Sequence, residues 1–235
     1  MKIKSAIADN LDRIRERIEA AARRAGRDPG AVRLVAVSKT VGAEKIREAV
    51  EAGAQVLGEN YLQEAQKKIE VLGPGISWHF IGHLQKNKAK YAVRLFDLIH
   101  SVDSLALAEE LDRAAEKNGR VQQILLQADL SGEATKFGAG EAEILQIAER
   151  IQGLKNVSVK GLMTMPPFSD DPEDSRPYFR KLRSLRDRLA RMKIPGISQE
   201  DLSMGMSGDF EVAIEEGATL VRIGTAVFGP RPAKQ

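Results

Sequence analysis

The chain has 235 residues, of which 43% are hydrophobic and 29% are charged, an ordinary composition for a globular protein. It contains no cysteine, which excludes disulfide frameworks and thiolate metal sites. The net charge of +3 could suggest nucleic acid, but basic and acidic residues are interleaved, as in RIRERIE at 13–19. Interleaved charges are typical of a solvated helix face. We therefore expect no nucleic-acid partner.

The first residues, MKIKS, lead into a charged amphipathic segment and have no apolar core of the signal-peptide type. No later apolar segment approaches the length that spans a membrane. We expect a cytoplasmic protein that does not insert into membranes, and the absence of cysteine is compatible with that reducing compartment.

An opening helix is expected at about 5–25, because Gly26 and the Asp28-Pro29 pair end its helical pattern. After it, short apolar runs alternate about eight times with segments of helical period. The expected strands are 34–37, 55–58, 78–81, 98–101, 123–128, 159–163, 202–204 and 220–223. The expected helices are 43–52, 61–71, 105–117, 142–151 and 177–192, with a further helix from about 210.

This alternation predicts an α/β fold, a single (β/α)8 barrel of the TIM type that spans 1–235 and carries an extra N-terminal helix. The main alternative is an open, doubly wound sheet. The barrel is favoured because special residues follow nearly every strand, whereas a doubly wound sheet gathers them at one switch point. The proline-rich, acidic segment 166–172 is predicted to be a loop within this domain.

Lys39 is the first candidate functional residue. It closes the run RLVAVSKT at 33–40, whose near-continuous apolar residues are typical of a buried parallel strand. In a barrel, active-site groups lie at this end of the strands. A low-polarity setting lowers the pKa of a lysine and frees its amine to attack a carbonyl carbon, so Lys39 is a candidate to form a Schiff base. The alternative is a lysine that marks the strand end and extends into water.

The last two strands lead into segments rich in glycine and hydroxyl groups. VRIGTA at 221–226 provides Gly224 and Thr225, and MGMSGD at 204–209 provides Ser207 just before the helix from about 210. Barrels often bind phosphate in the loops after strands seven and eight, where helix N-termini favour anions. We therefore predict a phosphate site there, with simple helix capping as the alternative.

Arg222 lies at the same end of the barrel, where a buried guanidinium needs an acceptor. A heterocyclic nitrogen would serve, and the alternative is an ion pair with Asp209 or Glu211. In a closed barrel, Lys39 on the first strand lies next to the eighth strand. A phosphorylated pyridine with an aldehyde would then be held at three points, and pyridoxal 5′-phosphate has these groups.

Six segments resemble the pyridoxal phosphate homeostasis proteins, which are related to the N-terminal barrel of bacterial alanine racemase. They are VAVSKT at 35–40, GENYLQE at 58–64, WHFIGHLQKNK at 78–88, GLM at 161–163, LSMGMS at 202–207 and VRIGT at 221–225. The resemblance covers nearly the whole chain. It implies that Lys39 carries the cofactor as a Schiff base and that Arg222 faces its pyridine nitrogen. It also implies a phosphate held by Ser207, Gly224 and Thr225, and a ring bordered by Asn60 and Met204.

The sequence departs from some members of this family, which carry a second lysine where Val41 stands here. Lys136 matches a family position proposed to receive the cofactor, and the alternative is an exposed loop charge.

His79 and His83 are four residues apart, but they lie in a strand and its loop with no third ligand nearby. We therefore predict no metal site, a structural role for His79 and a place at the barrel mouth for His83.

The resemblance favours a monomeric carrier in vitamin B6 homeostasis that stores, buffers or delivers pyridoxal phosphate to apoenzymes. The main alternative is a pyridoxal phosphate enzyme such as an amino-acid racemase, and a third is a barrel enzyme that forms a Schiff base with a sugar phosphate. Racemisation needs an acid/base group on each face of the substrate. Because the chain ends at FGPRP (228–232), directly after the last barrel unit, we expect no second domain to supply the opposing group. We therefore predict no robust turnover.

Overall fold

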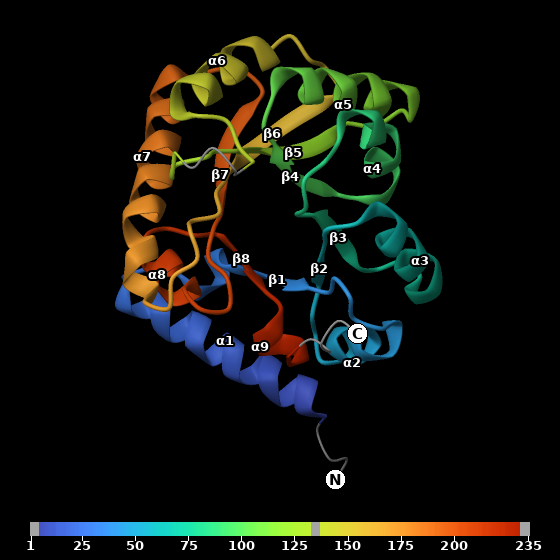
Figure 1. The fold of residues 1–235 in the computed structure, drawn as a ribbon, viewed down its shortest axis with the longest axis vertical. Helices are drawn as coiled ribbons and strands as arrows, with labels where there is room; N and C mark the ends of the chain where they lie inside the picture. Colours follow the sequence, from blue (N-terminus) through green and yellow to red (C-terminus); the bar gives the residue numbers. More distant parts are fainter. Residues whose placement is uncertain (1–4, 133–136, 231–235) are drawn as a thin grey trace.

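The structure is a computed structural model that describes residues 5–132 and 137–230. Eight parallel strands form a barrel in chain order, and β8 pairs with β1 to close it (Figure 1). The predicted (β/α)8 barrel is therefore confirmed. The strands are β1 (Arg33–Val37), β2 (Val56–Glu59), β3 (Ser77–Phe80), β4 (Leu98–Val102), β5 (Gln122–Gln127), β6 (Val157–Met163), β7 (Ile197–Ser203) and β8 (Leu220–Ile223).

Helices surround the barrel and cover the outer faces of the strands (Figure 1). In the part of the chain that the structure describes, no helix is long and apolar enough to cross a bilayer. The α-helices are α1 (Ala6–Arg24), α2 (Ala43–Glu51), α3 (Leu62–Leu72), α4 (Ala89–Leu95), α5 (Leu105–Lys117), α6 (Glu141–Ile151), α7 (Arg176–Met192), α8 (Phe210–Glu215) and α9 (Thr225–Phe228). The short 3-10 helices are η1 (Pro29–Ala31), η2 (Lys86–Lys88) and η3 (Pro172–Ser175).

Strand β7 and helix α4 differ from the sequence prediction. Strand β7 begins at Ile197, five residues before the predicted start, because its first half is polar and partly exposed and lacks the apolar run that marks a buried strand. Helix α4 has seven residues, too few for a clear helical period in the sequence.

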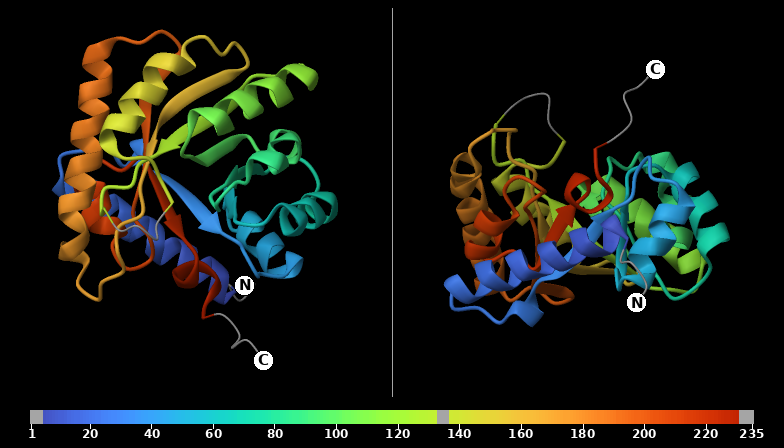
Figure 2. Two further views of the ribbon diagram at one scale, coloured as in Figure 1. Left: turned by 45° about the horizontal axis from the view of Figure 1, so that its top comes forward. Right: turned by 90° about the horizontal axis from the view of Figure 1, so that it is seen from below.

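The predicted N-terminal helix α1 lies along the outside of the barrel, against α8, α9 and α2 (Figure 2). Its first turn is capped by Ser5, whose Oγ accepts a hydrogen bond from the amide of Ala8 at 3.3 Å. Leu11 and Ile14 lie on its buried face. The helix thus supports the two short helices that follow β7 and β8.

The barrel interior has an apolar layer. Side chains from five strands form one cluster: Val35, Leu98, Leu125, Met163 and Leu220. Strands on different sides of a barrel can meet only through its interior, so these side chains point inward. Because side chains alternate along a strand, the interior positions nearer the carboxyl end lie two residues further on. On β4 and β8 these positions are His100 and Arg222, so a polar layer lies above the apolar one.

Candidate functional site

A cavity of about 520 Å³ opens at the carboxyl ends of the strands. This is the end at which barrels carry active sites. The structure brings six of the predicted residues together in its wall: Lys39, Asn60, Ser207, Arg222, Gly224 and Thr225. These six include two cationic residues and four neutral residues that offer hydrogen-bonding groups, and Asp209 and several apolar residues also line the wall.

Lys39 stands in a tight turn directly after β1. The amide of Val41 donates to the carbonyl oxygen of Ser38 at 3.0 Å and closes the turn. Thr40 has a φ of +64°, a left-handed conformation that branched side chains rarely adopt. The lysine is half-buried and lines the cavity, so the turn directs its side chain to the barrel mouth.

The loops after β7 and β8 meet at two hydroxyl groups. The hydroxyl of Thr225 donates to that of Ser207 at 3.2 Å. The β7 loop approaches β8 through Gly205, whose carbonyl oxygen accepts from the amide of Arg222 at 3.0 Å. Gly205 has a φ of +90°, and a Cβ there would lie 2.6 Å from that of Ala213, so only glycine fits. This close packing holds the hydroxyl pair in one place.

Arg222 is buried beneath the cavity and begins a chain of hydrogen bonds across the barrel. Its guanidinium donates to the Ser203 hydroxyl at 2.6 Å and to the Thr164 carbonyl oxygen at 2.9 Å. Ser203 lies 2.8 Å from Nδ1 of His100, and Nε2 of His100 lies 3.0 Å from Nδ1 of His79. Because arginine can only donate, the Ser203 hydroxyl accepts from it. Ser203, His100 and His79 continue the chain across the barrel.

Arg222 keeps its charge at neutral pH. Burial lowers its pKa to about 10, and the negative charge of Asp209 acts in the opposite direction. Within the described residues, neither Asp209 nor Glu211 forms an ion pair with Arg222, although both are the alternative partners expected from the sequence. Asp209 instead accepts from the amide of Met206 at 2.6 Å, and Glu211 pairs with Arg17. A buried cation that hydrogen-bonds neutral oxygens favours a ligand that offers it an acceptor.

Asn60 contributes an unsatisfied polar atom to the cavity wall. It follows β2 directly, and the loop after β3 packs tightly against it, since a Cβ at Gly82 would lie 2.4 Å from its carbonyl oxygen. Its Oδ1 is buried and has no hydrogen-bond partner among the described residues. Leaving such an atom unpaired costs about 1–3 kcal/mol, so a polar group of a ligand would stabilise this arrangement.

Comparisons with known proteins identify the family. Residues 10–232 match the family described as alanine racemase, N-terminal domain. The chain is 50% identical over 224 residues to the pyridoxal phosphate homeostasis protein of Aquifex aeolicus strain VF5, covering 95% of this chain and 97% of that one. With the corresponding protein of Escherichia coli strain K12 the identity is 40% over 229 residues, covering 96% and 97% of the two chains. The chain belongs to the pyridoxal phosphate homeostasis protein family.

Solved structures agree with this family membership. PipY of Synechococcus elongatus PCC7942, in its form with pyridoxal phosphate bound, is 39% identical and covers 95% of this chain and 100% of its own, with a TM-score of 0.84. The alanine racemase of Clostridium difficile 630 is 16% identical with a TM-score of 0.72, which shows a shared fold. That comparison covers 97% of this chain but only 57% of the racemase.

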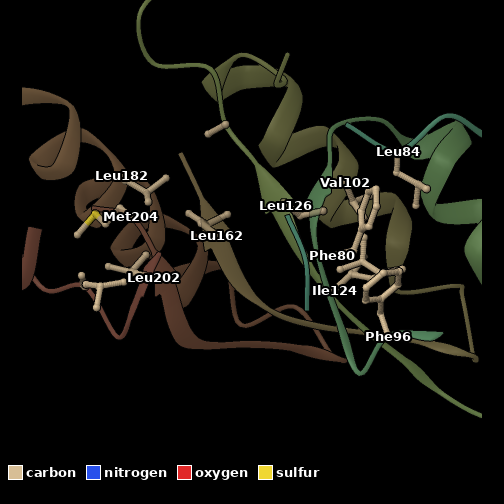
Figure 3. Packing of buried hydrophobic residues seen from close by; sticks show 14 of the residues in the cluster. Phe80, Leu84, Phe96, Val102, Ile124, Leu126, Leu162, Leu182, Leu202 and Met204 are labelled. Carbon is tan, nitrogen blue, oxygen red and sulfur yellow. The ribbon is translucent and has the colours of Figure 1, made fainter. Parts of the chain in front are cut away.

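Two residues predicted for the site in this family do not line the cavity. Met204 is fully buried in the hydrophobic core, beside Leu182 and Leu202 (Figure 3). His83 is exposed and stacks on the ring of Phe137, with centroids 3.8 Å apart. It lines a neighbouring cavity of about 730 Å³, which shares Asn60 with the first. Lys136 lies outside the described residues.

Sequence reasoning missed the polar residues behind the site. His100 and Ser203 lie within strands that the apolar residues around them indicate, and only the alternation from Leu98 points to an inward-facing His100. His79 is buried and lies 3.0 Å from His100. Within residues 5–132 and 137–230, no group of three or more histidine or carboxylate side chains could hold a metal ion.

The stability of the fold should depend on pH through the two buried histidines. Burial lowers the pKa of His79 to about 4, and it lowers the pKa of His100 well below its usual value. Below pH 6.5 the unfolded chain binds protons on both imidazoles, whereas the folded chain keeps them neutral. The free energy of unfolding should therefore fall as the pH drops from 6.5 to 4, by about 3 kcal/mol for His79 alone.

Urea unfolding of a His79→Asn variant tests this expectation, because the amide offers an acceptor to His100 but does not titrate. Its free energy of unfolding should fall less steeply than that of the wild type between about pH 7 and pH 4.5. His83→Asn, which replaces a histidine outside this buried pair, is the matched control. Identical slopes in all of these proteins would contradict the assignment.

Proposed function

We propose that this protein binds pyridoxal 5′-phosphate as a Schiff base on Lys39 and contributes to vitamin B6 homeostasis by buffering or delivering the cofactor. The observation that carries the proposal is the meeting of Lys39, Arg222 and the Ser207–Thr225 hydroxyl pair in one cavity. The family membership and the PipY structure with pyridoxal phosphate bound support the same ligand.

Each part of the cavity suits one part of the cofactor. When bound, pyridoxal phosphate supplies an aldehyde, an anionic phosphate and an aromatic nitrogen. Lys39 would hold the aldehyde carbon through its amine, in a C=N bond formed with loss of one water. The hydroxyl groups of Ser207 and Thr225 donate to phosphate oxygens, and the backbone at Gly224 allows close approach. The unpaired Oδ1 of Asn60 marks a further polar contact beside the ring.

Arg222 would leave the pyridine nitrogen unprotonated. A guanidinium can only donate, so the nitrogen facing it must act as an acceptor. An unprotonated pyridine is a poor electron sink for a substrate carbanion. This arrangement suits a protein that holds the cofactor, although the resemblance to racemases, which use the same arginine, means that it does not by itself exclude turnover.

The lengths of the relatives support a carrier over a racemase. The chain aligns with 97% of the Aquifex homeostasis protein but with 57% of the Clostridium racemase. We infer a monomeric protein that acts in the cytoplasm and exchanges the cofactor with pyridoxal phosphate-dependent apoenzymes. A chain without cysteine suits that reducing compartment.

The Schiff base can be mapped directly. Borohydride reduction of the purified protein, followed by peptide mass analysis, should locate a pyridoxyl group on Lys39. The Lys39→Ala variant should lose both this mass and the visible absorption band, whereas Lys136→Ala should keep them. A pyridoxyl group on another lysine, with Lys39 unmodified, would show that the assignment is wrong.

The phosphate site can be tested with two ligands. Ser207→Ala combined with Thr225→Val removes both hydroxyl groups, and we expect a loss of roughly 100-fold in affinity for pyridoxal phosphate. Binding of unphosphorylated pyridoxal, measured by the same spectroscopic titration, should change little. Equal losses for the two ligands would place the phosphate elsewhere.

The carrier role predicts negligible racemisation. The protein loaded with pyridoxal phosphate should be incubated with L-alanine in deuterated water, and both the D-isomer and deuteration at the α-carbon should be followed. We expect D-alanine at no more than the rate given by free cofactor, because a missing opposing acid/base costs at least about 100-fold. Formation of D-alanine at enzymatic rates that is lost in Lys39→Ala would instead identify an enzyme.

A further inference from the structure

A buried ionic cluster lies directly behind Lys39, between the barrel and helix α3. It consists of Glu59 at the end of β2 and of Glu64 and Lys68 on α3, and we refer to it as the Lys68 cluster. The Nζ atom of Lys68 lies 2.7 Å from Oε1 of Glu59 and 2.6 Å from Oε1 of Glu64. Lys68 is 7% exposed and Glu59 is fully buried. Neither carboxylate lines the cavity.

The Lys68 cluster holds the residues on both sides of Lys39. On one side, Ser38 accepts from Nζ of Lys68 through its carbonyl oxygen at 2.6 Å, and its hydroxyl donates to Oε1 of Glu59, also at 2.6 Å. On the other side, the amide of Thr40 donates to Oε1 of Glu64 at 2.5 Å. The two residues that flank Lys39 are thus hydrogen-bonded to the Lys68 cluster. Ser38 contacts Lys68 and Glu59, and Thr40 contacts Glu64.

This support acts on a strained turn. In a turn closed by the amide of Val41 and the carbonyl of Ser38, a positive φ at the third residue is normally taken by glycine. Here the third residue is Thr40, whose branched side chain disfavours that conformation. The charge-assisted bond from its amide to Glu64 offsets the strain. The direction of the Lys39 side chain therefore depends on contacts made by helix α3.

A buried ion cluster is a costly way to attach a helix to a barrel. Well-packed apolar side chains of similar size would hold α3 equally well or better, because charges lose their hydration on burial. Burial raises the pKa of Glu59 even though Lys68 and Ser38 donate to it. Its second oxygen, Oε2, has no hydrogen-bond partner among the described residues. The cluster is thus better explained by what it positions than by the stability it adds.

We propose that Lys68 is a positioning residue for Lys39, which acts through Glu59 and Glu64 to hold the turn 38–41 in the conformation that captures an aldehyde. The inference rests on the proposed Schiff base at Lys39. Without the cluster, the turn would populate other conformations, and the apparent affinity would fall in proportion to the fraction of competent protein.

The first test compares two substitutions at Glu64, which is partly exposed. Glu64→Ala removes the acceptor for Thr40, whereas Glu64→Gln keeps an oxygen in its place. In the cofactor-free protein, hydrogen exchange at the amide of Thr40 should be faster in Glu64→Ala and close to wild type in Glu64→Gln. With pyridoxal phosphate, borohydride trapping at limiting cofactor should show about a tenfold weaker affinity for Glu64→Ala only.

The second test removes the ammonium. Lys68→Met keeps an unbranched side chain and should produce the same faster exchange at Thr40, at least a tenfold weaker affinity and an altered circular dichroism of the bound cofactor. Gln122→Met is the matched control. It also removes a buried polar side chain that donates to backbone carbonyl groups, but it does so at the start of β5, at the opposite end of the barrel.

The outcomes separate the two proposals. A wild-type protein without a pyridoxyl group on Lys39 would overturn the proposed function, while exchange at Thr40 would still report whether the cluster holds the turn. Wild-type affinity and wild-type exchange in both Lys68→Met and Glu64→Ala would overturn the positioning role. An equal loss of affinity in Gln122→Met would also overturn it, because it would trace the effect to general destabilisation.

Discussion

The pairing of β1 with β8 is the constraint on which the site depends. In this pairing Val35 lies opposite Arg222 and Ala36 opposite Ile223. The next residues of each strand are therefore neighbours as well, and a Cβ placed on Gly224 would lie 3.4 Å from Val37. Barrel closure thus brings Lys39 beside the loop that carries Thr225. An open sheet would leave the first and last strands at opposite edges.

Closure of the barrel also buries the charged side chain of Arg222. Arg222 occupies an interior position directly above the apolar layer, where an isolated charge would be very costly. The Ser203 hydroxyl and the Thr164 carbonyl both accept hydrogen bonds from it, and a buried chain continues from Ser203 to His100 and His79. The guanidinium is held rigidly by neutral groups, so its charge remains available to a ligand in the cavity.

The two lysines near the mouth differ in what surrounds them. Lys39 reaches the cavity, whereas Lys68 is enclosed by Glu59, Glu64 and the backbone of Ser38. A lysine held by two carboxylates is a structural cation, and one at a strand end facing a cavity can act as a nucleophile. The site therefore has rigid polar support on two sides, from Arg222 within the barrel and from Lys68 outside it.

The sequence by itself determined the fold class and six of the residues in the cavity wall, because both depend on local pattern. Alternating apolar and helical segments predict the barrel, and Lys39, Ser207, Arg222 and Gly224-Thr225 each follow or end a strand. Only the tertiary structure decided the orientation of side chains and their partners. Met204 turns into the core and His83 stacks outside the cavity, while His100 contacts Ser203 on β7 and Lys68 donates to the backbone of Ser38 after β1. Such contacts arise from strand register and helix packing, which no local sequence pattern encodes.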